Sequence, residues 1–249
     1  MIENELLSYL KGFSMGPYVQ NKMLIASHFM WKDHCNYYSL DQTSENHLIS
    51  ILARAHDTGV NTYIHEVFSD KFSLIFDVDS KDTSLNLRNL IANIYDTIRN
   101  FFEMKSTDIS CIVFTASSDT KASFHIHFPN IIVNKQTCKM FYDELLSKDK
   151  KLRDVVDEQI IDHSKLRMPF SDKWDSKLRQ PVGRKLIYYG SYNHRCQRYN
   201  PEYECDTFEL LSRSTVRRDS LVELTKMKVS LRNIDLVTMN HMEDDSIDL

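Results

Sequence analysis

The pattern of apolar and polar positions along the chain predicts an α+β protein. Residues 72–79 form an apolar, aromatic run typical of a buried strand, and residues 109–114 and 121–128 also have the character of strands. Residues 85–104 repeat apolar side chains at helical spacing, so we expect a long amphipathic helix that covers one face of a sheet. The same spacing predicts further helices at 5–13, 45–56 and 136–147.

Two carboxylates end the first predicted strand. Asp77 and Asp79 are two residues apart, and because side chains alternate across a strand, both point to the same face. Two negative charges this close repel unless a cation or a proton lies between them. The pattern indicates a divalent metal site at a strand end. The alternative is an ordinary acidic turn, since residues 79–82 also have good turn chemistry.

The strand at 121–128 alternates strictly, with its apolar side chains on one face. Ser123, His125 and His127 therefore share the opposite face. A hydroxyl and an imidazole two residues apart can hold phosphate oxygens, and Lys121 adds a positive charge just before them. The alternative is a polar sheet face on which the histidines only hydrogen-bond to their neighbours.

Residues 155–162 are a third informative stretch, in which apolar pairs flank single acids. An aspartate on a strand here, Asp157 or Asp162, would complete a three-carboxylate metal site with Asp77 and Asp79. The basic side chains that follow, Arg167 and Lys173, are suited to a triphosphate.

Composition places the chain among ordinary globular proteins. It has 249 residues, 42% hydrophobic and 27% charged, which suits one large domain or two small ones. No apolar run approaches the length of a membrane span, and the acidic N-terminus is unlike a secretory signal. Five cysteines without a Cys-x-x-Cys pair favour a reduced, intracellular compartment over a disulfide framework.

The distribution of charge is more informative than the net charge of −4. Between residues 163 and 200 there are nine Lys or Arg but only two acids, Asp172 and Asp175, whereas residues 243–249 are an acidic tail. Aromatic residues that could stack on bases are interleaved with the basic ones. This cationic, aromatic segment predicts a localised site for a polyanion.

The order of these motifs resembles the catalytic core of the archaeo-eukaryotic primases over about residues 66–192. The resemblance is greatest to the branch that holds the primase-polymerases and the replicative primases of large DNA viruses of the herpesvirus, poxvirus and baculovirus types. It rests on a DxD after an apolar strand, a Lys-x-Ser-x-His strand, and an Asp followed about ten residues later by Leu-Arg and then a Lys. Ile160 and Ile161 stand where the family often has Val-Tyr.

The resemblance assigns roles residue by residue. Asp157 fits the family spacing to Leu166-Arg167 better than Asp162, although it falls one residue short. The metal ligands would be Asp77, Asp79 and Asp157. The nucleotide-binding residues would be Lys121, Ser123, His125, Arg167 and Lys173, with His125 also in the catalytic set.

The resemblance also implies an activity. It is template-directed synthesis of short primers on single-stranded DNA for DNA replication, from nucleoside triphosphates, by nucleotidyl transfer with two Mg²⁺ or Mn²⁺ ions. The implied fold is an antiparallel RRM-like sheet flanked by helices. The implied partners are single-stranded DNA and a separate helicase or accessory primase subunit. Membrane association is not expected. The place of action would be at replication sites inside the cell, in the host nucleus or cytoplasm if the protein is viral.

We expect three regions: an N-terminal helical part at 1–65, the primase catalytic core at 66–192, and a C-terminal extension with an acidic tail at 193–249. Relatives often carry a zinc module, for which His194, Cys196 and Cys205 are candidate remains. A closed structural zinc site needs four ligands, so zinc is not predicted.

Two alternatives remain open. His125-Ile126-His127 also matches the His-hydrophobic-His metal motif of nicking endonucleases, for which Tyr142 is the candidate nucleophile. The other alternative is a non-catalytic primase-like subunit that binds DNA or a partner, which the intact acids disfavour.

Overall fold

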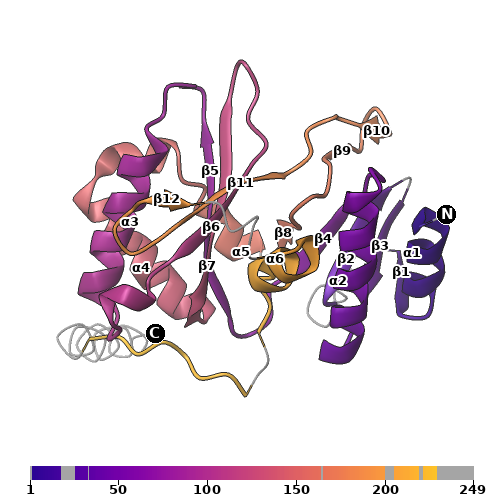
Figure 1. Ribbon diagram of the computed structural model, residues 1–249, viewed down its shortest axis with the longest axis horizontal. Coiled ribbons are helices and arrows are strands. Elements are labelled where there is room, and N and C mark those ends of the chain that lie inside the picture. Colours follow the sequence, from indigo (N-terminus) through magenta and orange to yellow (C-terminus); the bar gives the residue numbers. More distant parts are fainter. Residues whose placement is uncertain are drawn as a thin grey trace, which may run out of the picture.

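The computed structural model describes residues 2–17, 26–32, 34–163, 165–199, 205–218 and 221–228. Two antiparallel five-stranded sheets lie side by side along the long axis of the molecule (Figure 1). The N-terminal sheet has the order β1 (Ser14–Pro17), β3 (His34–Tyr38), β2 (His28–Lys32), β4 (Ile64–Val67), β8 (Lys165–Arg167). The central sheet has the order β12 (Arg198–Tyr199), β11 (Ile187–Tyr192), β6 (Cys111–Thr115), β7 (Ala122–Val133), β5 (Phe72–Ser80).

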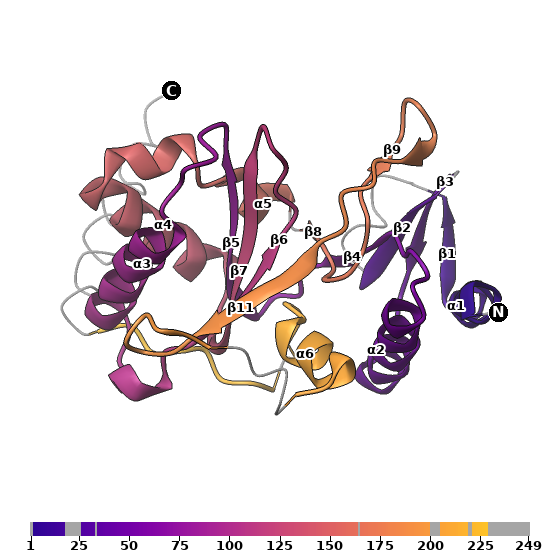
Figure 2. The same cartoon turned by 45° about the horizontal axis from the view of Figure 1, so that its top comes forward.

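Helices α3 (Leu87–Phe101) and α4 (Lys135–Lys148) cover one face of the central sheet (Figures 1 and 2). Each begins at an asparagine whose side chain accepts a backbone N–H three residues on, Asn86 for α3 and Asn134 for α4. The apolar stripes of both helices pack on the apolar residues of β5 and β7, where the ring of Phe76 stacks on Tyr142 at 4.9 Å. The predicted α+β architecture with an antiparallel sheet is confirmed.

The N-terminal part contains more strand than we expected. Helices α1 (Ile2–Lys11) and α2 (Gln42–Asp57) are present as predicted, but residues 1–65 also supply β1, β2, β3 and the start of β4. These strands have only four or five residues each, too few for their alternation to stand out in the sequence. In addition, β8 comes from within 66–192 yet pairs with β4, so the N-terminal sheet is built from both regions.

Residues 155–162 do not form the predicted strand. After the 3₁₀ helix η3 (Lys150–Asp154), only Val156 makes a bridge, with Val78 of β5, and α5 (Gln159–His163) follows at once. The side chain of Asp157 accepts the backbone N–H of Gln159 at 2.9 Å, which turns the chain into this helix.

The remaining described elements lie outside the two five-stranded sheets. The 3₁₀ helix η2 (Ser106–Asp108) precedes β6, and β9 (Trp174–Asp175) with β10 (Gln180–Pro181) forms a projecting hairpin (Figure 1). Helix α6 (Thr207–Ser214) lies between the sheets (Figure 2).

The acidic tail at 243–249 lies outside the described residues. Within the described ranges, the helices are all too short or too polar to cross a membrane.

Candidate active site

The pairing of β5 with β7 brings the two predicted motifs face to face. The antiparallel register sets Asp77 opposite His125 and Asp79 opposite Ser123. Their neighbours Phe76 and Val78 point to the helices, so both aspartates point to the other face of the sheet. The Nε2 atom of His125 lies 3.6 Å from Oδ1 of Asp77. The strand ladder alone therefore assembles half of the predicted site.

The acids of this site are crowded and partly buried. Burial, together with the negative charges of Asp79 and Asp157, raises the pKa of Asp77 to about 7. Asp79 is more exposed, and its Oδ2 atom lies 2.6 Å from Nζ of Lys121. Burial lowers the pKa of His125 well below its usual value, with the positive charge of Arg167 as a second cause, so this imidazole is neutral.

The geometry separates the two candidates for the third acid. The backbone N–H of Asp157 donates to the carbonyl oxygen of Asp77 at 2.9 Å, which places this acid beside β5. Asp162 is instead held by Lys139 at 2.7 Å and Lys135 at 3.3 Å, and these lysines keep its pKa low. The structure therefore favours Asp157 over Asp162.

The opposite wall of the site comes from the N-terminal sheet. β8 pairs antiparallel with β4, and the register sets Arg167 opposite His65. Arg167 is fixed by a hydrogen bond from its guanidinium to the carbonyl oxygen of Arg184 at 2.6 Å. Burial lowers the pKa of Arg167, while the carboxylate of Asp77 raises it. The guanidinium of Arg167 thus lies near Asp77 although the two residues belong to different sheets.

A cavity of about 210 Å³ joins the two walls. It is lined by His65, Asp77, Asp79, Lys121, Ser123, His125, Lys165, Leu166, Arg167, Lys173 and Arg184. All the predicted site residues except Asp157 line this cavity. Asp157 adjoins it through its hydrogen bond to Asp77.

The sequence did not single out three lining residues, His65, Lys165 and Arg184. His65 reaches the site only because β4 pairs with β8, a contact between residues far apart in the chain. Burial, with Arg167 next in effect, lowers its pKa to about 3. Lys165 and Arg184 belong to the basic segment, but composition could not separate them from its other cations.

The row Ser123, His125, His127 does not act as one group. The face that carries it is buried against the N-terminal sheet and α6, which leaves His125 4% and His127 1% exposed. Ser123 and His125 line the cavity, whereas the ring of His127 packs edge-on against Phe114 at 5.5 Å.

The acids fit a divalent cation in their chemistry. Carboxylate oxygens suit Mg²⁺ or Mn²⁺, and the Oδ1 atom of Asp79 is buried with no hydrogen-bond partner in the described part of the chain. A cation would satisfy this atom and relieve the repulsion that raises the pKa of Asp77. Among the described residues, however, no three metal-ligating side chains are grouped closely enough to share one ion. Asp77 and Asp79 are therefore the two acids whose placement suits a divalent cation, whereas the side chain of Asp157 is turned toward Gln159.

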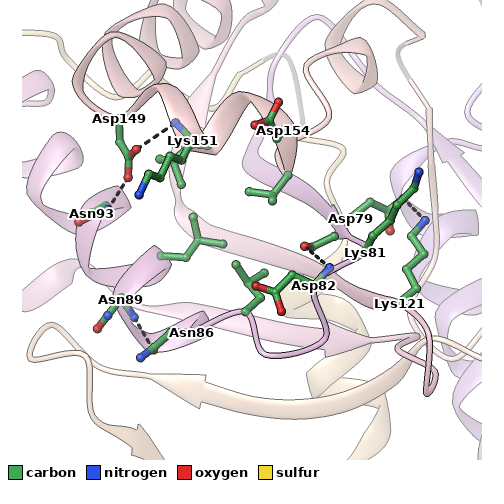
Figure 3. A pocket seen from close by; sticks show the side chains of 15 residues that line it. Asp79, Lys81, Asp82, Asn86, Asn89, Asn93, Lys121, Asp149, Lys151 and Asp154 are labelled. Atoms are coloured by element: carbon green, nitrogen blue, oxygen red, sulfur yellow. Dashed lines mark hydrogen bonds and ion pairs between the residues drawn. The ribbon is translucent and has the colours of Figure 1, made fainter.

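A larger hollow of about 1040 Å³ adjoins the cavity and shares Asp79 and Lys121 with it (Figure 3). Three asparagines of α3 and its N-cap line this hollow together with Asp149, Lys151 and Asp154, and Asn93 lies beside Asp149 (Figure 3). The asparagines are Asn86, Asn89 and Asn93. Lysines and aspartates are mixed here, so this hollow is less cationic than the cavity.

Tyr142 is not placed for nucleophilic attack. It is 1% exposed on α4, and its hydroxyl donates to the carbonyl oxygen of Ile75 at 2.6 Å. Its ring stacks on Phe76, on the face of the sheet away from His125 and His127. Burial also raises its pKa well above the usual value. The structure therefore contradicts the choice of Tyr142 as the nucleophile of a nicking endonuclease.

Comparison with known families agrees with this geometry. The family model described as the C962R protein N-terminal AEP domain, where AEP denotes archaeo-eukaryotic primase, matches residues 27–182. A search of curated proteins finds no match. The matched range is well over half of the chain, and it contains every residue that lines the cavity except Arg184. The chain therefore belongs to the archaeo-eukaryotic primase superfamily, in its large-DNA-virus branch.

Proposed function

We propose that this chain is a DNA primase that makes short primers on single-stranded DNA for replication. One observation carries the proposal: a single cavity sets Asp77 and Asp79 against the basic side chains of Lys121, Arg167 and Lys173. Carboxylates that suit divalent cations and basic side chains that suit a triphosphate, lining one cavity, are the parts that nucleotidyl transfer needs.

The residues that line the cavity have separate roles in binding the triphosphate and the divalent cations. Arg167 binds the triphosphate of the incoming nucleotide, and its bond to the carbonyl oxygen of Arg184 holds the guanidinium in place. Ser123 donates a hydrogen bond to a phosphate oxygen, and neutral His125 does the same through its ring N–H. Asp77 and Asp79 would hold Mg²⁺ or Mn²⁺, and Asp157 would join them once its side chain leaves the N–H of Gln159. When bound, these ions would supply the positive charge that activates a 3′-hydroxyl and neutralises a pyrophosphate leaving group.

The acceptor strand and the template would lie on either side of this cavity. The larger hollow next to Asp79 is placed to receive the nucleotide that supplies the 3′-hydroxyl. The β9–β10 hairpin projects next to the cavity, to which it contributes Lys173, and it carries exposed Lys177 and Arg179. We assign to it the phosphates of the template strand. A separate helicase or accessory subunit at replication sites would complete the machinery.

The test is incubation of the protein with single-stranded template, labelled nucleoside triphosphates and Mg²⁺ or Mn²⁺, followed by sizing of the products. Ribonucleotides and deoxynucleotides are supplied separately. We expect short primers from the wild type and none from Asp77→Ala. Asp162→Asn is the matched control, because it removes a carboxylate that pairs with a lysine of α4, and it should retain synthesis. Undiminished synthesis by Asp77→Ala would overturn the proposal.

The ion pair between Lys121 and Asp79 favours a second candidate, a non-catalytic primase-like subunit that binds DNA. In that case Lys121 takes the place of a cation permanently. Binding of single-stranded DNA with no product under any metal condition would support this function over the first.

A further inference from the structure

The C-terminal part of the described chain lies beyond the family-matched range and crosses from one sheet to the other. We call residues 205–218 the strap. Its helix α6 packs on α2, and Leu210 and Leu211 join the core that fills the space between the sheets. The Thr207 hydroxyl donates to Asp57 at the end of α2 at 2.7 Å. Figure 2 shows α6 between the two sheets.

The peptide groups of Val216 join the two sheets directly. Its N–H donates to Oε2 of Glu66 on β4 at 3.0 Å. Its carbonyl oxygen accepts the N–H of Ser73 on β5 at 2.8 Å. Val216 is completely buried and Glu66 is 1% exposed, so water does not compete for these bonds.

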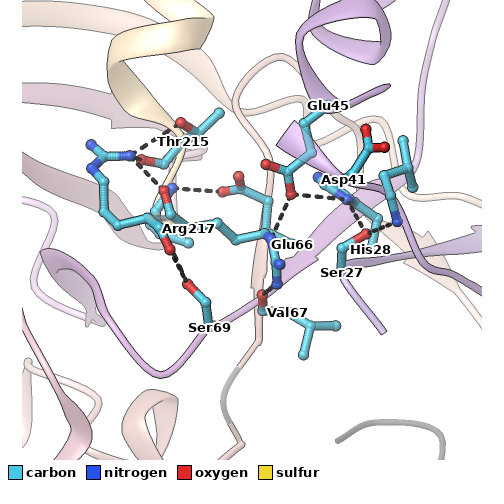
Figure 4. A network of polar contacts seen from close by, with 12 residues as sticks. Ser27, His28, Asp41, Glu45, Glu66, Val67, Ser69, Thr215 and Arg217 are labelled. Atoms are coloured by element: carbon cyan, nitrogen blue, oxygen red, sulfur yellow. Dashed lines mark hydrogen bonds and ion pairs between the residues drawn. The ribbon is translucent and has the colours of Figure 1, made fainter. Parts of the chain in front are cut away.

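Arg217 reinforces the same junction (Figure 4). Its Nε atom donates to Oε1 of Glu45 on α2 at 2.5 Å, and a terminal nitrogen donates to the carbonyl oxygen of Val67 at 2.8 Å. The backbone of Arg217 also bridges Phe72 of β5. One arginine therefore holds α2, the end of β4 and the start of β5.

The strap also secures the short connection between β4 and β5. The N–H of Arg218 donates to the carbonyl oxygen of Lys71 at 3.2 Å and to the Ser69 hydroxyl at 3.1 Å. This connection is the shortest covalent path between the two sheets, and it would act as the hinge if they moved apart.

These strands carry the two walls of the candidate active site. On β4, His65 is the neighbour of Glu66 and lies opposite Arg167. On β5, Asp77 follows Ser73 by four residues, about 13 Å along a strand. A change in the strap would therefore alter the separation between the acids and the cations that face them.

We propose that the strap positions the two walls of the nucleotide site, with Arg217 as the principal positioning residue. Arg217 lies outside the cavity and touches no substrate; it acts through β4 and β5. The inference rests on the proposed function for its effect on catalysis, whereas its effect on β4 does not depend on any activity. A misplacement of about 1 Å between reacting groups can reduce a rate about 100-fold.

The experiment compares Arg217→Gln, Arg217→Lys and Arg213→Gln. Arg213 is an exposed residue of α6, so its substitution makes the same charge change on the same segment. Hydrogen exchange followed by mass spectrometry reports the opening of β4 and β8. Steady-state kinetics of nucleotide addition reports kcat and KM, at a temperature at which circular dichroism shows each variant to be folded.

We expect Arg217→Gln to speed exchange in β4 and β8 and to lower kcat/KM at least 10-fold. Arg217→Lys keeps a positive charge next to Glu45, so its exchange rate in β4 and β8 and its kcat/KM should lie between those of Arg217→Gln and the wild type. Arg213→Gln should match the wild type. Wild-type exchange in β4 for Arg217→Gln, or kinetics equal to those of Arg213→Gln, would overturn the proposal. If the wild type makes no primers, the proposed function fails, and the exchange data alone decide whether the strap holds β4.

Discussion

The ammonium of Lys121 and the carboxylate of Asp79 form an ion pair of 2.6 Å at the point where the small cavity meets the larger hollow. Both side chains are about one-third exposed, at 34% and 39%. An exposed pair of this kind contributes little to folding, roughly 0–1 kcal/mol. The lysine is therefore available to exchange Asp79 for a phosphate oxygen when a nucleotide and its cation bind.

Replacement of Lys121 by Met should accordingly weaken nucleotide binding rather than the fold. We expect KM for the incoming nucleotide to rise about 10-fold, which corresponds to one charged contact of about 1.4 kcal/mol. The free energy of unfolding should change by less than about 1 kcal/mol. Nucleotide titrations and urea unfolding measure the two quantities. Lys135→Met, which removes one of the partners of Asp162, is the control. A large loss of stability with unchanged KM would contradict this role.

Tyr142→Phe should leave primer synthesis intact but destabilise the fold. The buried carbonyl oxygen of Ile75 loses the hydroxyl that donates to it, at a cost of about 1–2 kcal/mol. Urea unfolding and the primer assay measure the two effects. Tyr95→Phe, which removes a buried hydrogen bond to the carbonyl oxygen of Tyr192, should behave alike. A covalent protein–DNA adduct that forms with the wild type and is lost only in Tyr142→Phe would restore the nicking alternative.

The β9–β10 hairpin should account for part of the salt dependence of binding to single-stranded DNA. Each phosphate contact contributes a slope of about −0.7 to log K against log salt. Lys177→Gln together with Arg179→Gln should therefore reduce the slope by about 1.4 and weaken binding to all sequences alike. Fluorescence anisotropy at several salt concentrations measures this slope.

The matched control for the hairpin is Lys139→Gln with Lys148→Gln. These two lysines lie on α4 and already pair with Asp162 and Glu144. We expect this double variant to keep the wild-type slope. Equal slopes for the two double variants would remove the hairpin from the template path.

Glu66 should make stability depend on pH. Burial raises its pKa from 4.5 to about 7, so the folded state keeps a proton that the unfolded state loses. The associated stability is fully present below about pH 4.5 and is lost as pH rises to about 7, by an amount on the order of 2–4 kcal/mol. Glu66→Gln keeps an acceptor for the N–H of Val216 and should remove most of this decline.

Urea unfolding of the wild type and Glu66→Gln at intervals between pH 4.5 and 8 measures the effect. Glu5→Gln is the control, because Glu5 forms an exposed pair with Arg54 on the outside of the N-terminal part. The free energies of unfolding of the wild type and of Glu66→Gln should diverge as pH rises. Parallel curves across this range would mean that Glu66 is charged in the folded protein.

The sequence by itself determined the local parts of the site. Alternation along a strand places Asp77 and Asp79 on the same face of their strand. It likewise places Ser123 and His125 on the same face of theirs, whatever lies around them. The helical spacing of α3 likewise determined which of its sides packs on the sheet. The shared strand face and the buried helix side both follow from the spacing of residues that are close together in the chain.

The tertiary structure alone decided what faces those residues. His65 enters the cavity, and Asp157 rather than Asp162 adjoins Asp77, through contacts between segments far apart in the sequence. The strap is held in the same way, by Glu45 and Glu66 about 150–170 residues away from it. A periodic pattern reports only which side of an element is buried, and the choice of partner depends on how whole elements pack. The cavity therefore exists only once β4 and β8 are seated across from β5 and β7.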